Sequence, residues 1–137
     1  MKLFLDANIC LDMLDSTREN SKTSIELYMK YRDELSVKFY FSGDFITTIY
    51  YILTQRKKIA PSKALEAIDA LCNEITPCYI NHDDYLVAKN SFFEGLFDDF
   101  EDLIILGSAN RIGCDRFITN DKKLLALKNF KGVKIGI

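Results

Sequence analysis

The chain has 137 residues, of which 48% are hydrophobic and 12% aromatic, so it can bury one substantial core but has no room for a second domain. Its formal net charge of −2 argues against a protein that binds nucleic acid mainly through a basic surface. The apolar stretches are shorter than the roughly 20 residues that cross a membrane, and the first residues do not resemble a signal peptide. We therefore expect one domain over residues 1–137, located in the cytoplasm and without a membrane partner.

Cysteine and histidine usage argues against a zinc site. The four cysteines have no paired C-x-x-C spacing and lie inside apolar segments, which favours packing in the core: Cys10, Cys72, Cys78 and Cys114. His82 is the only histidine in the sequence, and it lies in a predicted loop beside Asp83 and Asp84. We expect His82 to be a surface residue.

In the first third of the chain, an apolar run is followed by two helical patterns. Residues 2–5 predict a strand that ends at Asp6, and residues 9–14 predict a short helix followed by a polar loop. Ser21 has the character of an N-cap for a helix that extends to about Arg32. This helix is expected to bury Ile25, Leu27 and Tyr28.

The middle of the chain repeats this alternation of strand and helix. Residues 37–42 are rich in β-forming side chains and predict the next strand, after which the spacing predicts a helix over 45–57. Pro61 suits the first turn of a further helix. The two helices are expected to bury Phe45, Ile46, Ile49, Tyr50, Ile52 and Leu53, and then Ala64, Leu65, Ile68, Leu71 and Cys72.

The last part of the chain contains two more helices between short strands. A strand is predicted over 78–80, followed by a helix that Asp83 or Asp84 caps and that extends to about Phe93. A second helix is predicted over 100–112, with Gly113 as its stop, followed by strands over 116–119 and near 133–135. Strands separated by helices predict an α/β fold with a central parallel sheet covered on both faces.

Acidic residues follow two of these strands directly. Asp6 follows the strand over 2–5, and Asp121 follows the strand over 116–119, so the two acids occupy equivalent places. In an open parallel sheet all strand C-termini lie at one edge, which is where ligands bind. With Asp102 at a helix start nearby, the three acids would form one carboxylate pocket.

Helix capping is the alternative interpretation of the acids around Asp102. Asp99 is a natural N-cap, and Glu101 and Asp102 fall in the first turn, where the exposed N–H groups and the helix dipole stabilise a carboxylate. The sequence alone leaves both interpretations open.

Four segments, in the right order and over nearly the whole chain, together resemble a PIN domain, and more narrowly its VapC-like branch. They are Phe4-Leu5-Asp6-Ala7-Asn8, residues 41–53, Asp99-Phe100-Glu101-Asp102, and residues 113–121 ending in Ile118-Thr119-Asn120-Asp121. The resemblance implies a three-layer α/β/α fold and metal-dependent cleavage of single-stranded RNA. It also implies the role of toxin in a type II toxin–antitoxin pair, with a small antitoxin protein as partner.

The resemblance also assigns roles to single residues. Asp6, Asp102 and Asp121 match the catalytic acids that bind the metal ion, Asn8 and Thr119 match polar residues that support them, and Asp99 is an additional acid near the site. Such carboxylates suit Mg²⁺ or Mn²⁺, which prefer hard oxygen ligands. The ion would orient and acidify a water and neutralise charge on the phosphate oxygens, so no nucleophilic side chain is required.

At one position the sequence departs from the family pattern. The family commonly has an acid early in the helix after the second strand, and Thr48 stands at that position. Asp44 lies four residues earlier, one helical turn away, and would either project toward the same edge or act as the N-cap of that helix. The missing acid leaves metal binding plausible and puts full catalytic strength in doubt.

Three other classes of protein share parts of this pattern. A haloacid dehalogenase-type phosphotransferase would have a second aspartate where Asn8 stands, and a response-regulator receiver would have adjacent acids after its first strand, with only Asp44 to phosphorylate. The third is a PIN-like fold without turnover that serves as an RNA- or protein-binding module. The discriminating observation is cleavage of single-stranded RNA with and without Mn²⁺.

Basic and aromatic side chains suggest where partners bind. Arg56-Lys57-Lys58 and Lys122-Lys123 would contact phosphates, although such runs are more often solvated surface. The chain has 7 Tyr and 10 Phe, and helices around Tyr28-Met29 and Tyr50-Tyr51 are candidates for an exposed apolar surface. Homodimers are common in the family, so we expect a dimer.

Overall fold

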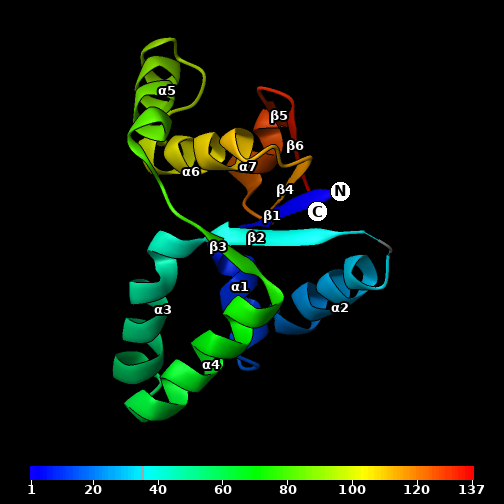
Figure 1. Cartoon of the computed structure of the whole chain (residues 1–137), viewed down its shortest axis with the longest axis vertical. Coiled ribbons are helices and arrows are strands. Elements are labelled where there is room, and N and C mark those ends of the chain that lie inside the picture. Colours follow the sequence, from blue (N-terminus) through cyan, green and yellow to red (C-terminus); the bar gives the residue numbers. More distant parts are fainter. Residues whose placement is uncertain (35) are drawn as a thin grey trace.

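The computed structural model describes residues 1–34 and 36–137, and its centre is a six-stranded sheet (Figure 1). The strands are β1 (Lys2–Leu5), β2 (Lys38–Ser42), β3 (Thr76–Cys78), β4 (Arg116–Ile118), β5 (Asn129–Phe130) and β6 (Val133–Gly136). Their order is β3-β2-β1-β4-β6-β5. All neighbouring strands are parallel except β5 and β6, which form an antiparallel pair at one edge. The predicted parallel α/β sheet is therefore confirmed, with one antiparallel edge strand added.

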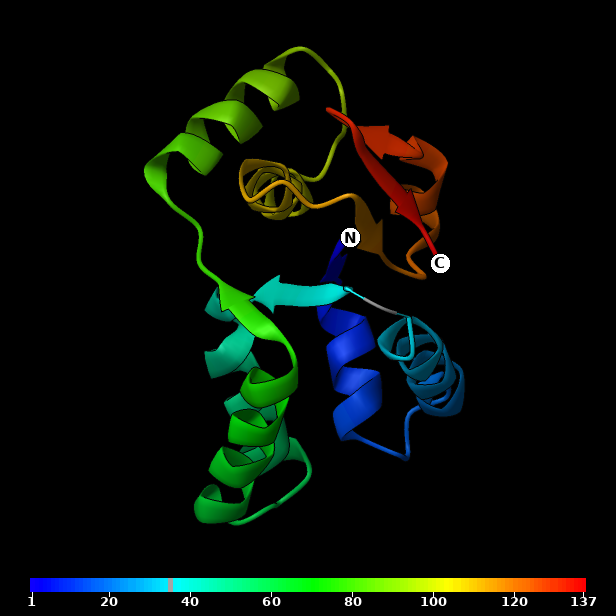
Figure 2. The same ribbon diagram turned by 45° about the vertical axis from the view of Figure 1, so that its right-hand side comes forward.

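Helices cover both faces of this sheet. They are α1 (Ala7–Leu14), α2 (Ser21–Arg32), α3 (Ile46–Tyr51), α4 (Pro61–Glu74), α5 (His82–Phe93), α6 (Phe100–Arg111) and α7 (Lys122–Leu127). Helices α1 to α4 lie on one side of the sheet and α5 to α7 on the other, in both ribbon views (Figures 1 and 2). This is the three-layer α/β/α arrangement predicted from the sequence.

The alternation of side chains along β1 divides the core into two clusters. Leu3 and Leu5 pack with the helices α1 to α4, whereas Phe4 points to the other face. There Phe4 stacks on Phe117 of β4, with ring centroids 5.4 Å apart. All three β1 side chains are at least 98% buried, as expected for a central strand whose two faces are covered.

Three of the predicted helix starts were wrong, because in each case the residue before the helix is not the predicted one. Helix α1 begins at Ala7 and not at residue 9, because Asp6 caps it through the Ala7 N–H. Ser21 is not an N-cap but the buried first residue of α2, after Asn20. The cap of α5 is Asn81 and not Asp83 or Asp84, and a reciprocal hydrogen bond between Asn81 and Asp84 completes a capping box.

The helix predicted over 45–57 consists of three types of turn. A 3-10 turn over Gly43–Phe45 precedes α3, and a π-helical segment over Ile52–Arg56 follows it. The strand predicted over 78–80 lies two residues earlier, at Thr76–Cys78. Helix α7 and strand β5 were not predicted, because six and two residues are too short to show a periodic pattern.

Most of the predicted inward-facing side chains are buried or half-buried, and three are exposed. Ile25, Tyr50 and Leu65 are exposed by 39%, 36% and 53%, because each lies at the solvent edge of its helix. Cys10, Cys78 and Cys114 are buried and Cys72 is half-buried, and all four are free thiols. His82 is exposed as predicted, but it lies in the first turn of α5 and not in a loop.

Among the helices of the described residues, none has the length and apolar character that a membrane crossing requires.

Candidate functional site

Asp6 and Asp121 lie at the same edge of the sheet, as predicted. Strands β1 and β4 are parallel neighbours with Leu5 beside Ile118, so the residues that follow them leave the sheet side by side. Asp6 then caps α1, and Asp121 caps α7 through the N–H groups of Lys123 and Leu124. Each acid thus has one carboxylate oxygen at a helix N-terminus, where the exposed N–H groups and the helix dipole stabilise negative charge.

Thr119 connects the two acids. Its hydroxyl donates to Oδ2 of Asp6 over 2.7 Å and accepts from the backbone N–H of Asp121 over 3.0 Å. Thr119 is fully buried, so these hydrogen bonds form away from water. The other oxygen of Asp6 accepts from the Ala7 N–H over 2.8 Å. The supporting role that the sequence suggested for Thr119 therefore has a geometric basis.

Asp102 and Asp99 lie together at the start of α6. Asp99 is the N-cap, and its Oδ1 accepts from the Asp102 N–H over 3.1 Å, so the capping interpretation is confirmed for Asp99. The Asp102 carboxylate is half-buried and takes part in no hydrogen bond or ion pair of residues 1–34 and 36–137. Capping therefore does not account for the Asp102 side chain.

The pKa of Asp102 shows that the acids act on one another. Burial raises it first, and the charges of Asp99, Asp6, Asp121 and Glu101 raise it further, to about 7. Burial and the charge of Asp121 also raise the pKa of Asp6, against the lowering effect of its hydrogen bonds from Thr119 and Ala7. A cation bound among these acids would relieve their repulsion.

The remaining predicted residues make no side-chain hydrogen bond to these acids within residues 1–34 and 36–137. Asn8 is exposed in the first turn of α1, and Thr48 is exposed on α3. Asp44 is not a helix N-cap, because it lies inside the 3-10 turn, whose N-cap is Ser42. Its carboxylate instead accepts from the Ile80 N–H over 2.8 Å, and it is not among the charges that raise the pKa of Asp102.

The acids have the ligand type and the charge that a metal ion prefers, but their carboxylates lack the close spacing of a metal site. Among the described residues, no three histidine, cysteine or acidic side chains converge closely enough to hold a metal ion. Asp6 and Asp121 are turned toward the helix N-termini that they cap. A hard divalent cation would therefore have to draw the carboxylates together, with Asp102 as the one that makes no other bond.

A cavity of about 330 Å³ opens next to the acids and was not anticipated from the sequence. Its lining comes from β1, the start of α1, the end of β2 with the 3-10 turn that follows it, the linker after β3, and α6: Phe4, Ala7, Ser42, Asp44, Phe45, Ile80, Glu101, Ile104 and Ile105. Residues from positions 4 to 105 meet there only through the fold. No local sequence motif indicates such a cavity.

Comparison with known proteins points to a single family. A family model for the PIN domain matches residues 2–123. Ribonuclease VapC1 from Aquifex aeolicus is 35% identical over 127 residues, which cover 88% of this chain and 82% of the relative.

Two solved structures share the fold at 15% sequence identity. VapC20 of Mycobacterium tuberculosis, a toxin that cleaves the sarcin-ricin loop, has a TM-score of 0.69 and matches 96% of this chain and 98% of its own. VapBC2 of Rickettsia felis, bound to a DNA fragment from its promoter, has a TM-score of 0.67 and matches 100% of this chain and 99% of its own.

The raised pKa of Asp102 predicts a pH-dependent effect of Asp102→Asn on the metal-free protein. When the pKa is raised in the folded state, from 3.8 to about 7, the proton stabilises the fold, and this stability is lost as the pH rises through the folded-state pKa. The variant should thus be more stable than the wild type at about pH 8, and the difference should shrink toward about pH 3, where both the folded and the unfolded state are protonated.

Urea unfolding across this pH range measures the difference. The matched control is Asp69→Asn, which removes an exposed carboxylate on α4. If Asp102→Asn destabilises the protein equally at every pH, Asp102 acts only as a first-turn helix residue, and repulsion among the acids is not significant.

Proposed function

The chain belongs to the PIN-domain family, and from this premise we propose that it is a metal-dependent endoribonuclease that cleaves single-stranded RNA. The observation that carries the proposal is the carboxylate of Asp102, whose pKa is raised by burial and by the charges of four neighbouring acids. A carboxylate in this position, which caps no helix and lies among other acids, is suited to a divalent cation.

We propose further that the protein is the toxin of a type II toxin–antitoxin pair. The 35% identical relative is named Ribonuclease VapC1, and VapBC complexes from Rickettsia felis, nontypeable Haemophilus influenzae and Salmonella typhimurium share the fold. These names support a small antitoxin protein as the partner of this chain.

Asp6, Asp102 and Asp121 are the residues that would hold Mg²⁺ or Mn²⁺. The bound ion supplies Lewis acidity, which lowers the pKa of a water and offsets charge on the scissile phosphate. The contribution of the chain is to position the ligands. Thr119 fixes the Asp6 carboxylate and the Asp121 backbone together, and Asp99 adds negative charge beside Asp102.

Basic side chains beside Asp121 are suited to the RNA backbone. Lys122 and Lys123 are exposed in the first turn of α7. Lys123 pairs with Asp98 over 3.6 Å, but both side chains are more than 70% exposed, so this ion pair is weak and easily exchanged for a phosphate. The positive charge that RNA binding requires, and that the acidic site lacks, would thus come from these lysines at its rim.

Cleavage of a single-stranded RNA with and without Mn²⁺ tests the proposal. The wild type should cleave only with the metal ion, and Asp102→Asn should lower the single-turnover rate by about a hundredfold or more, because a ligand is lost. Asp69→Asn on α4 is the control. A wild-type protein that is inert on every RNA at saturating Mn²⁺ would instead favour the PIN-like binding module.

The position of Thr48 yields a second prediction. If the acid that is common in the family is missing there, Thr48→Glu should restore an oxygen ligand and tighten Mn²⁺ binding by roughly tenfold. Asp44→Asn should leave the Mn²⁺ affinity unchanged, because the Asn oxygen can still accept from the Ile80 N–H. The opposite result, a loss of affinity in Asp44→Asn and none gained in Thr48→Glu, would make Asp44 the substitute ligand.

We also propose that the protein is a homodimer. Tyr28, suggested from the sequence as part of an exposed surface, is buried in the core, so the exposed side chains of α3 and α4 are the better candidate surface. Tyr50, Tyr51 and Leu65 are exposed by 36%, 55% and 53%. An apolar surface of this kind is typical of interaction sites.

Light scattering at tens of micromolar should give twice the 15.8 kDa of one chain. Replacing Tyr51 and Leu65 together by Ser should shift the mass to the monomer, whereas Met29→Ser on α2 should not, although Met29 is 41% exposed. A wild-type monomer at this concentration would rule out the dimer.

A further inference from the structure

The cavity beside the acids combines apolar walls with two carboxylates at its rim. Phe45 from the 3-10 turn, Ile80 from the β3–α5 linker, and Ile104 and Ile105 from α6 supply apolar surface. Asp44 and Glu101 lie at the rim on opposite elements, and both are exposed residues. The lining thus combines apolar surface with hydrogen-bond acceptors, and its volume of about 330 Å³ is within the range of small-ligand pockets.

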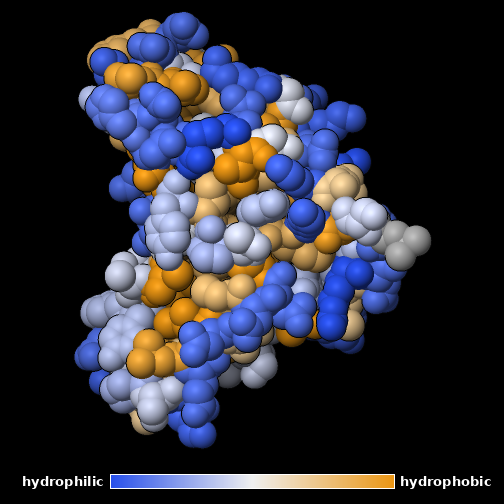
Figure 3. All heavy atoms as spheres, in the orientation of Figure 1, coloured by the Kyte–Doolittle hydropathy of each residue, from blue (hydrophilic) through white to orange (hydrophobic). Residues whose placement is uncertain are grey.

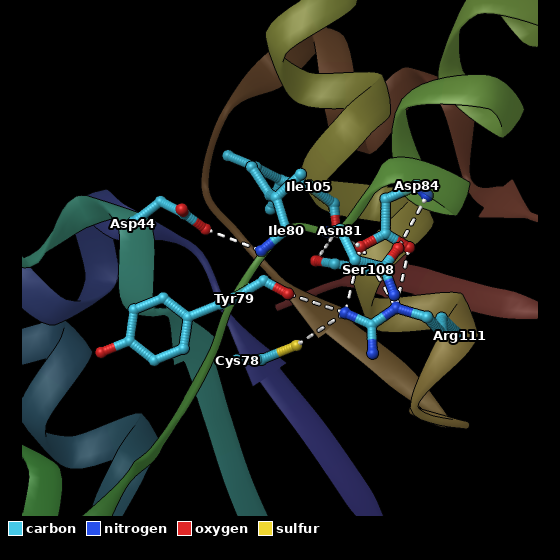
Figure 4. A network of polar contacts seen from close by, with 9 residues as sticks. All are labelled: Asp44, Cys78, Tyr79, Ile80, Asn81, Asp84, Ile105, Ser108 and Arg111. Atoms are coloured by element: carbon cyan, nitrogen blue, oxygen red, sulfur yellow. Dashed lines mark hydrogen bonds and ion pairs between the residues drawn. The ribbon is translucent and has the colours of Figure 1, made fainter.

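The linker that carries Ile80 is held from two sides (Figure 4). On one side the Asp44 carboxylate accepts from the Ile80 N–H over 2.8 Å. On the other, Arg111 of α6 donates to the Tyr79 carbonyl over 2.7 Å and pairs with Asp84, whose side chain is only 2% exposed. Because these contacts fix the linker before anything binds, Ile80 is a preorganised wall of the cavity.

An exposed aromatic ring lies beside this wall. The Tyr79 ring packs against Gly43, so closely that a Cβ at Gly43 would come within 2.6 Å of a ring carbon. Tyr79 is nevertheless 56% exposed, which leaves much of its side chain open to solvent. Figure 3 shows apolar side chains in the hollow between the α5–α6 half and the α3–α4 half of the molecule. The bases of a single-stranded nucleic acid stack favourably on an exposed aromatic ring of this kind.

The cavity adjoins the proposed catalytic acids along the chain. Ala7 follows Asp6 directly, and Glu101 precedes Asp102, so the two sites share the end of β1 and the start of α6. An RNA phosphate placed at the acids would therefore have one of its neighbouring bases within reach of the cavity. This step rests on the proposed function.

We propose that the cavity is a nucleobase subsite that selects guanine. Ionised carboxylates are acceptors only, and guanine alone among the four bases presents two adjacent donors, N1–H and the 2-amino group, to one carboxylate. The single N–H of the uracil edge lies between two carbonyl oxygens, which the carboxylates repel. Glu101, and the Asp44 oxygen that the Ile80 N–H does not occupy, are the specificity-determining groups, while Phe45 and Ile104 enclose the base.

Nucleosides without a phosphate test the cavity separately from the metal site. Guanosine, inosine and uridine are titrated into the protein in the presence of EDTA, and the backbone amide signals of Ile80, Ile104 and Ile105 are followed by NMR. Guanosine should shift these signals, inosine, which lacks the 2-amino group, should bind about tenfold more weakly, and uridine more weakly still.

Three variants assign the effect to the cavity. Glu101→Gln should remove most of the preference for guanosine over inosine, and Ile104→Phe should abolish binding of all three nucleosides by filling the cavity without changing its charge. Asp69→Asn on α4, which does not line the cavity, is the matched control for a lost carboxylate and should change nothing. The dispersion of the amide spectrum reports whether each variant is folded.

Failure of the subsite is distinguishable from failure of the proposed function. Guanosine binding in a protein that cleaves no RNA would support the subsite alone, whereas Mn²⁺-dependent cleavage without nucleoside binding would overturn the subsite alone. Equal binding of guanosine and uridine would also overturn it. So would a result in which N-acetyl-argininamide shifts these amides and no nucleoside does, because the cavity would then accept a basic peptide side chain.

Discussion

Repulsion among carboxylates at one edge of the sheet is the constraint on which the rest of this structure depends. The parallel pairing of β1 with β4 brings Asp6 and Asp121 to this edge, and the start of α6 adds Asp99, Glu101 and Asp102. A fold selected for stability alone would separate these charges or pair them with lysine or arginine. Their accumulation around a half-buried carboxylate, where burial and the neighbouring charges raise the pKa of Asp102 to about 7, is therefore a sign of function.

The fold tolerates this repulsion because most of the acids also cap helices. Asp6 caps α1, Asp121 caps α7 and Asp99 caps α6, so each carboxylate is bonded to backbone N–H groups that would otherwise lack a partner. The capping and the ligand interpretations are thus compatible for the same residues. Asp102 is the exception, since capping gives no account of its side chain, and among these acids it has the most strongly raised pKa.

Sequence reasoning predicted the parallel sheet, the two helical layers and the shared edge of Asp6 and Asp121, because these follow from strand ends and apolar periodicity. It placed the start of α1 two residues too late, and it assigned the cap of α5 to Asp83 or Asp84, which are as suitable for a cap as Asn81. The hydrogen bond from Thr119 to Asp6 spans 113 residues, and the bond from Ile80 to Asp44 spans 36. Contacts of this kind, and the cavity that they border, depend on tertiary structure and leave no local pattern in the chain.

The titration of the Asp102 carboxyl, followed by carbon NMR in the free protein and again in saturating Mg²⁺, tests the central claim most directly. The account predicts a midpoint near the value of about 7 in the free protein, and a fall of more than about one pH unit when the metal ion is bound. A midpoint near the ordinary value of 3.8 in the free protein, unchanged by Mg²⁺, would contradict both the repulsion among the acids and their role in binding a cation.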